Sequence, residues 1–166
     1  ATIFTADDIQ QKVLESMSLA TQKLWNIGNY ERHHYKDLGL EKFPNWFDQK
    51  KRLKSHYWSK ALPSHTGQLL LKKLDEAWKS YFELRRTGGV EDPQPPRFKK
   101  QRIFIPFDAT TAIKREGEVF RFTIAKQERQ FLFSTYGVSI DFLRIRLPWF
   151  ADLKHIKEIT IYPMDG

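Results

Sequence analysis

A chain of 166 residues that is 40% apolar, with 24 aromatic residues (13 Phe, 6 Tyr and 5 Trp), can bury a core and is too apolar and too aromatic to be intrinsically disordered. No stretch approaches the ~20 consecutive apolar residues of a membrane span, and the first residues lack the pattern of a signal peptide, so the sequence predicts a soluble, cytoplasmic protein. Cysteine is absent, which excludes disulfides, thiolate nucleophiles and thiolate zinc sites.

The positive charge is concentrated in the middle of the chain. Residues 44–102 contain 14 Lys/Arg against 6 Asp/Glu, whereas residues 1–43 contain 5 against 6 and residues 103–166 contain 9 against 8. The middle third therefore accounts for the whole formal net charge of +8. A basic segment with interleaved aromatics favours a nucleic-acid partner, and the alternative is an ordinary solvated, lysine-rich helix face.

Three helices are predicted in the first half of the chain. Thr5 and Asp8 form a near-match to a capping box, and apolar residues then recur at helical spacing over 6–36. A basic helix is expected over 45–58, between Pro44 and Pro63. The clearest helix starts with Ser64 as its candidate cap and ends at Gly88-Gly89.

The pattern changes after the segment 90–96, Val-Glu-Asp-Pro-Gln-Pro-Pro, which cannot continue a helix. Beyond it, apolar and polar residues alternate in short runs that predict strands over 103–107, 112–115, 119–124, 143–147 and 156–162. The interval 126–141 fits a short helix or an edge strand equally well. The order predicts an α+β fold, with helices in residues 5–92 and strands in residues 93–166.

No catalytic motif stands out. The His-Glu-x-x-His spacing, the phosphate-binding glycine patterns and the Gly-x-Ser-x-Gly elbow are all missing. Turn chemistry already explains four aspartates that fall in loops or at predicted strand ends, namely Asp108, Asp141, Asp152 and Asp165. We therefore expect no catalytic site and no metal site in this chain.

The segment from Pro95 to Arg102 places four cations around Phe98 in an extended, proline-stiffened connection, a form that can follow a sugar-phosphate backbone. Phe98 could stack on a base or anchor the connection to the protein, and both roles stay open here. In the predicted second helix, Lys51, Lys54 and Ser55 are expected to form a polar strip opposite Leu53.

Three stretches of the chain carry a family resemblance. The first runs from Leu62-Pro63-Ser64-His65 into residues 71–82, the second is Pro96-Arg97-Phe98-Lys99-Lys100, and the third is Leu147-Pro148 with residues 156–161. Together they resemble the amino-terminal half of the TnpB family of transposon-encoded RNA-guided DNA nucleases, which are related to the compact type V CRISPR effectors, and the third stretch looks like that family's closing strands. The resemblance implies a helical recognition lobe over 5–92 and an antiparallel, oligonucleotide-binding-like β-barrel, the wedge domain, over 93–166, with Ala1 to Phe4 as a remnant of its first strand.

The resemblance also implies a function. The chain would bind a guide RNA and a DNA motif beside the target, with the nuclease half of the same protein as a further partner, in a prokaryotic, nucleoid-associated setting. Cleavage, and the Mg²⁺ that it needs, would belong to that nuclease half, so we expect no enzymatic activity and no cofactor in this chain. The expected nucleic-acid-binding residues are Lys50, Lys51, Arg52, Lys54, Ser55, Gln68, Lys72, Lys73, Arg97, Phe98, Lys99, Lys100 and Arg102.

Within this set, Lys51, Ser55, Gln68 and Lys72 are the candidates for reading bases, and the basic connection is the candidate for contacting phosphates. The alternative function is a free-standing, transposon-derived regulator whose basic helices read duplex DNA without RNA. RNA that co-purifies with the protein would favour the first function, and a duplex footprint by RNA-free protein would favour the second.

Overall fold

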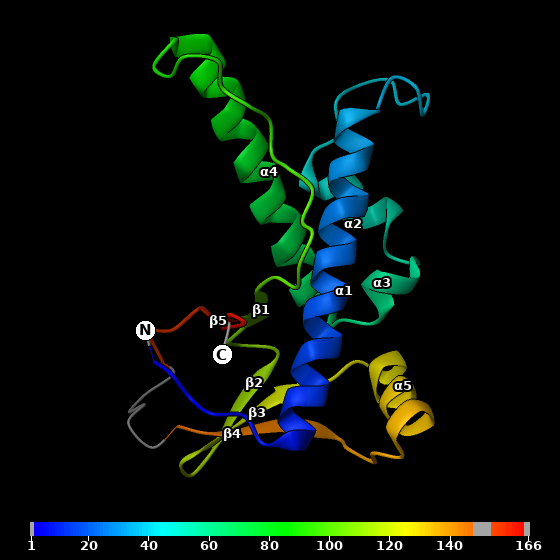
Figure 1. Ribbon diagram of the computed structural model, residues 1–166, viewed down its shortest axis with the longest axis vertical. Coiled ribbons are helices and arrows are strands. Elements are labelled where there is room, and N and C mark those ends of the chain that lie inside the picture. The colour runs from blue at the N-terminus through cyan, green and yellow to red at the C-terminus, as the bar shows by residue number, and fades with distance from the viewer. Residues whose placement is uncertain (1, 148–153, 165–166) are drawn as a thin grey trace.

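The computed structural model describes residues 2–147 and 154–164 and has helices first and antiparallel strands second (Figure 1). Helices α1 (Asp8–His33), α2 (Trp46–Arg52), α3 (Tyr57–Lys60) and α4 (Ser64–Thr87) precede strands β1 (Ile105–Asp108), β2 (Ile113–Glu116) and β3 (Val119–Thr123). Helix α5 (Lys126–Tyr136) then separates β3 from β4 (Phe142–Arg146) and β5 (Glu158–Ile161). The predicted α+β class is confirmed. No helix within the described residues has both the length and the apolar character needed to cross a membrane.

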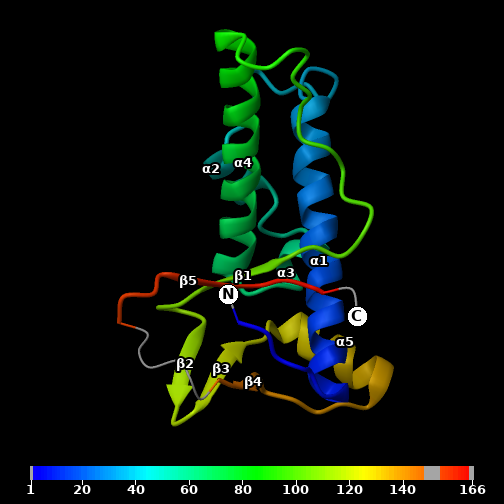
Figure 2. The same ribbon diagram turned by 60° about the vertical axis from the view of Figure 1, so that its left-hand side comes forward.

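Helices α1 and α4 run side by side in the same direction, with α2 and α3 in the return segment between them (Figure 2). A capping box starts α1, since Asp7 accepts from the backbone N–H of Gln10 at 2.8 Å and the Gln10 side chain accepts from the N–H of Asp7 at 2.9 Å. The predicted cap at Thr5 is therefore displaced by two residues. The buried residues of α1 follow helical spacing, and they include Val13, Met17, Ala20, Leu24 and Gly28.

Gly28 lies where α1 packs closely against α4. A Cβ atom at this position would lie 2.9 Å from Leu74 Cδ2 and 3.1 Å from Leu71 Cδ2, so a larger residue would force the leucines of α4 outward. At the other end of α4, Gly88 has a φ of 66° and ends the helix in the left-handed conformation, as the sequence predicts.

The predicted second helix over 45–58 is wrong in one respect, because it is two short helices with a turn between them. Leu53 ends α2 and is 7% exposed, and the Nδ1 atom of His56 then accepts the backbone N–H of Trp58 at 3.2 Å to begin α3. The polar strip expected along one continuous helix is therefore broken at residues 53–56.

The strands form two antiparallel sheets. Strand β1 pairs with β5, with Ile105 opposite Ile161, and β3 lies between β2 and β4 in a three-stranded sheet. The rings of Phe107 and Phe122, one from each sheet, meet at a centroid distance of 4.9 Å. The closed barrel expected from the resemblance is not seen within the described residues, where the two sheets share no strand pairing. Residues 2–4 lie outside any strand, and Ala1 lies outside the described residues.

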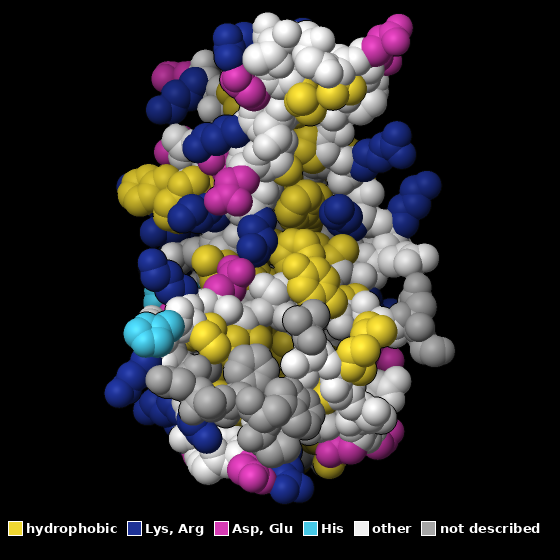
Figure 3. Space-filling view, turned by 90° about the vertical axis from the view of Figure 1, so that its left-hand side faces the viewer, with side chains coloured by type: hydrophobic (Ala, Val, Ile, Leu, Met, Phe, Trp, Pro, Cys, Tyr) yellow, Lys and Arg dark blue, Asp and Glu magenta, His cyan; other side chains and the backbone are white. Residues whose placement is uncertain are grey.

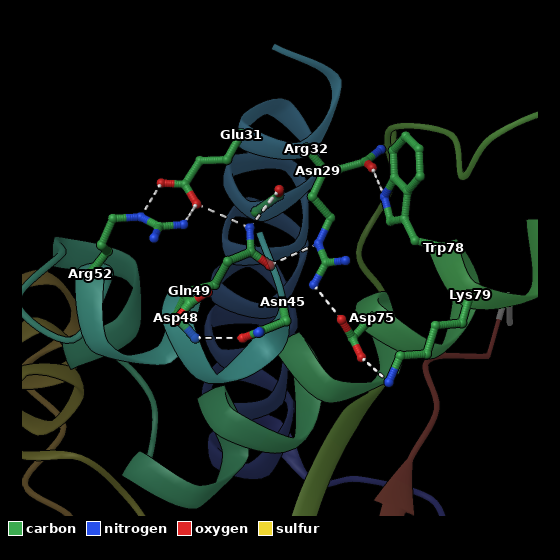
Figure 4. Close-up of polar contacts among 11 residues, drawn as sticks. Asn29, Glu31, Arg32, Asn45, Asp48, Gln49, Arg52, Asp75, Trp78 and Lys79 are labelled. Carbon is green, nitrogen blue, oxygen red and sulfur yellow. Dashed lines mark hydrogen bonds and ion pairs between the residues drawn. The ribbon is translucent and has the colours of Figure 1, made fainter. Parts of the chain in front are cut away.

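A buried polar network joins α1, α2 and α4 (Figure 4). The guanidinium of Arg32 donates to Asp75 Oδ1 and to Gln49 Oε1, both at 2.9 Å, and the side chains of Arg32 and Asp75 are only 1% and 4% exposed. Gln49 in turn donates to the carbonyl of Gly28 at 2.9 Å, and Lys79 lies 2.9 Å from Asp75 Oδ2. Each of the three helices therefore contributes one side chain to the hydrogen bonds of the ion pair: Arg32 from α1, Gln49 from α2 and Asp75 from α4.

Removing the carboxylate from this pair should destabilise the fold. Asp75→Asn leaves the charge of Arg32 buried without a counter-ion, and the expected loss in the free energy of unfolding is about 3–5 kcal/mol. Glu76→Gln, at the next and exposed position of α4, is the control and should change stability by less than about 0.5 kcal/mol. Urea unfolding of the three proteins measures both effects, and equal stabilities would contradict this role of the ion pair.

The same pair predicts a pH dependence. Burial alone would raise the pKa of Asp75, but hydrogen bonds from Lys79 and Arg32 outweigh burial and hold the pKa below its ordinary value. A lowered carboxyl pKa contributes stability that is present above the pKa of the unfolded state and is lost as the pH falls through the native value. Unfolding of wild type below about pH 4 should therefore show a stability loss that Asp75→Asn lacks.

Candidate nucleic-acid interface

The connection between α4 and β1 lies against α1 (Figures 1 and 2). Its carbonyls accept from side chains of α1: Asn29 Nδ2 donates to Pro96 O at 2.9 Å and Asn26 Nδ2 donates to Lys99 O at 2.9 Å. The backbone N–H of Lys99 donates to Asn26 Oδ1 at 2.7 Å. Further contacts to the same backbone come from Gln22, Trp25 and His33. We call residues 95–102 the docked linker.

All the side chains of α1 that hold the docked linker are formally neutral when His33 is neutral. They are amides, an indole and an imidazole. The contact in which a linker side chain donates to α1, Arg102 Nε to Glu15 O at 3.0 Å, uses a backbone carbonyl. The described contacts that fix the linker involve no acidic side chain, so they leave the charge of its four cations uncompensated. Arg97 and Lys100 are exposed, and neither makes an ion pair within the described residues.

Phe98 stacks on the ring of His33, with a centroid distance of 5.3 Å and an interplanar angle of 28°, and is still 44% exposed. The ring is therefore attached to the protein and accessible at the same time. The neighbouring Lys99 holds its ammonium 5.0 Å from the ring centroid of Trp25, a cation–π distance.

Internal contacts occupy several of the other predicted cations. Arg52 lies 3.0 Å from Glu31, and Lys73 lies 3.2 Å from Glu158. Lys50 and Lys51 lie over the ring of Phe47, at 4.9 and 4.4 Å from its centroid. Lys54 and Lys72 are exposed and have no described ion pair. The cations without an acidic partner among the described residues thus include two on the docked linker, Lys54 in the turn before α3 and Lys72 on α4.

The four candidate base readers come from different elements. Lys51 is on α2 and Ser55 lies in the turn before α3, whereas Gln68 and Lys72 are four residues apart on α4 and share a face. None of the four side chains makes a hydrogen bond or ion pair in the described part of the chain, and Gln68 alone is partly buried. Helix α2 packs against α4, so Lys51 lies on an element that adjoins the one carrying Gln68 and Lys72.

On the face drawn in Figure 3, Lys and Arg side chains lie on both sides of a band of hydrophobic side chains that runs along the molecule. Acidic side chains are interspersed among them. Cations next to hydrophobic side chains suit a partner that has both charged and apolar groups, and a nucleic acid, with its phosphates and bases, is one such partner.

The aspartates set aside as turn residues behave as predicted where the structure describes them. Asp108 Oδ1 accepts from the backbone N–H groups of Thr110 and Thr111 at 2.9 and 3.0 Å, and hydrogen bonding, led by the Thr110 hydroxyl, lowers its pKa. Asp141 accepts from Arg144 at 2.8 Å, and hydrogen bonding lowers its pKa to about 2. Asp152 and Asp165 lie outside the described residues. Within the described ranges, no group of three or more His, Asp or Glu side chains is placed to hold a metal ion.

Helix α5 resolves the interval that the sequence left open, since 126–136 is helical and only Glu128 and Leu132 are buried on it. A groove of about 360 Å³ lies beside it, lined in part by Lys126, Arg129 and Phe133, which is 63% exposed. Sequence analysis missed this combination of cations and an aromatic. The sequence did not decide between a helix and a strand for this interval, so it could not predict which side chains share an exposed face.

A comparison of the sequence with models of known protein families, and with curated protein sequences, finds no match.

The amide contacts of the docked linker make a testable prediction. Asn26→Ala removes both hydrogen bonds to Lys99, and the expected cost is about 1–2 kcal/mol in the free energy of unfolding. Amide exchange at Lys99 should become faster than in wild type. Gln11→Ala is the control, because the side chain of Gln11 donates to Glu15 on its own helix and makes no hydrogen bond to the linker among the described residues. Unchanged protection of the Lys99 amide would show that the linker is held in another way.

Glu128 makes a further prediction. Burial raises its pKa to about 7, against the opposing effect of a hydrogen bond with Ser16. Between the unfolded value and the native value the folded state binds more protons, so stability should fall as the pH rises from about 4.5 to 7, by up to about 3 kcal/mol. Unfolding at pH 5 and pH 8 tests this. Glu128→Gln should lose this part of the pH dependence, and Glu91→Gln, an exposed control, should keep it.

Proposed function

We propose that this chain is a nucleic-acid-binding module that contacts phosphates through the docked linker. The supporting observation is the way the linker is held: its backbone is fixed by formally neutral side chains of α1, while Arg97 and Lys100 stay exposed and form no ion pair with a described residue. A preordered, uncompensated row of cations attracts a polyanion and loses little conformational entropy on binding.

The ring of Phe98 supports the same proposal, because it lies within this row of cations and is accessible for stacking. The linker thus offers phosphate contacts and one base platform within a few residues. In the proposed complex, Lys51, Ser55, Gln68 and Lys72 add contacts to base edges from the helices.

More specifically, we infer that the chain acts as the recognition and wedge portion of a TnpB-like, RNA-guided DNA nuclease, and that it binds guide RNA and duplex DNA without cutting either. This inference rests on the sequence resemblance. The order of helices before antiparallel strands agrees with it, and in that family the strands belong to an oligonucleotide-binding-like barrel.

Salt dependence tests the phosphate contacts. Binding to nucleic acid should weaken as salt rises, and Arg97→Ala or Lys100→Ala should make the plot of log affinity against log salt shallower by about 0.9 for each phosphate that the variant no longer neutralises. The same substitutions should weaken binding to all sequences alike. Lys114→Ala, at an exposed position on β2, is the matched control and should keep the wild-type slope. A flat plot for wild type would contradict the proposal.

Base reading has a different signature. Ser55→Ala or Gln68→Ala should change the preference among DNA sequences, by about 1–3 kcal/mol at a contacted base pair, and should leave the salt slope unchanged. Binding to a panel of duplexes at two salt concentrations separates the two groups of variants. Uniform weakening by the helix variants would show that base reading belongs to another element.

Purification of the protein with and without RNase distinguishes the two proposed functions, the RNA-guided module and the regulator that acts without RNA. Structured RNA that co-purifies and is required for duplex binding supports the RNA-guided module. A duplex footprint that survives complete removal of RNA overturns the RNA-guided part of the proposal and leaves DNA binding intact.

A further inference from the structure

A second possible site lies away from the docked linker, in a cavity of about 70 Å³ between α1, α3 and α5. Ser16 of α1 and Glu128 of α5 contribute polar groups to it. Tyr57 and Trp58 of α3 and Phe131 of α5 contribute aromatic rings. The cavity therefore combines one acidic group with three aromatic side chains.

The carboxylate of Glu128 is an unusual group to find there. Glu128 is 3% exposed, and its Oε1 atom has no hydrogen-bond partner. A buried carboxylate oxygen without a donor loses its hydration and gains nothing in return, so such groups are rare in folded proteins. Glu128 also lines the cavity, so a donor that binds there next to this side chain would supply the missing hydrogen bond.

No cation is among the causes that shift the pKa of Glu128, so none of the described charged groups acts as its counter-ion. Lys12 of α1 pairs with Asp8 at 2.6 Å, and the side chain of Gln127 donates to the carbonyl of Tyr57 at 2.8 Å. Among the described lining residues, Glu128 and Tyr57 are the only titratable ones. No cation of the described chain therefore neutralises Glu128.

The rings favour a positively charged occupant. Tyr57 is 53% exposed and Phe131 is 37% exposed, so both are accessible to an incoming group. Aromatic faces attract cations, most strongly where water is excluded. The volume of the cavity limits the size of the occupant. One water molecule needs a cavity of about 10–15 Å³, so a cavity of about 70 Å³ admits a group of about five non-hydrogen atoms. A nucleobase is too large for it.

We propose that this cavity binds the guanidinium or primary ammonium group of a small organic cation, which donates to Glu128 Oε1 and contacts the rings of Tyr57 and Phe131. The site shares no lining residue with the docked linker, so the proposal does not rest on nucleic-acid binding. Burial raises the pKa of Glu128 to about 7, and a bound cation favours the ionised form, so binding releases a proton near neutral pH.

The test is an NMR titration of the full chain with methylguanidinium and with methylammonium. N-methylurea, a neutral molecule of the same shape as methylguanidinium, is the ligand control. At least one cation should shift the indole signal of Trp58, and it should bind about tenfold more weakly at pH 6 than at pH 8, because Glu128 is mostly protonated at the lower pH. N-methylurea should produce no saturable shift.

Two variants and one further measurement make the test decisive. Glu128→Gln keeps the shape of the side chain and should weaken cation binding at least tenfold at pH 8, whereas Glu91→Gln should bind as wild type does. The carboxyl carbon of Glu128 should titrate at a lower pH when the cation is present. Equal binding of N-methylurea, equal binding by Glu128→Gln, or a titration of Glu128 that the cations do not move would each overturn the proposal.

Discussion

The buried ion pair between Arg32 and Asp75 is the constraint on which the helical part of the molecule depends. Charges at this depth are tolerated only when their hydrogen-bonding groups have partners, and the partners come from three helices: Gln49 on α2, Asp75 on α4 and Arg32 itself on α1. Lys79 adds a second cation to Asp75. A shift of any one helix would separate a charge from its partner, so the pair fixes the relative positions of all three.

The fixed helix pair in turn positions the docked linker, and Asn29 makes the connection. Its side-chain oxygen accepts from Trp78 Nε1 of α4 at 2.9 Å, and its amide nitrogen donates to Pro96 O of the linker at 2.9 Å. One buried side chain therefore joins α1, α4 and the linker. Because side chains of α1 already bond to backbone groups at Pro96, Arg97 and Lys99, a nucleic acid bound at these residues would meet side chains in preference to backbone.

Local patterns in the sequence were enough to predict the long helices, the extended linker and most of the strands, because helical spacing, prolines and alternation act within a few residues of each other. The break before α3 depends on the side chain of His56, which caps a helix that the apolar pattern alone does not require. Arg32 and Asp75 are 43 residues apart, so no local pattern could pair them. The closed barrel came from the resemblance, and the strand pairings instead give two separate small sheets. The burial of Glu128 likewise depends on how α5 packs against α1 and α3.

Charge counts from sequence overstate what a partner would meet, and the structure shows which part of the excess is available. In the basic middle third, Arg52, Lys73, Lys79 and Arg86 each lie within 3.2 Å of an acidic oxygen, so internal partners partly cancel their charges. The linker is different, because its partners on α1 are amides and rings and cancel nothing. Had acidic side chains held the same backbone, the geometry would be similar and the local potential would be lost. A segment that is ordered and still uncompensated combines low entropy cost with electrostatic attraction, and both terms favour binding of a polyanion.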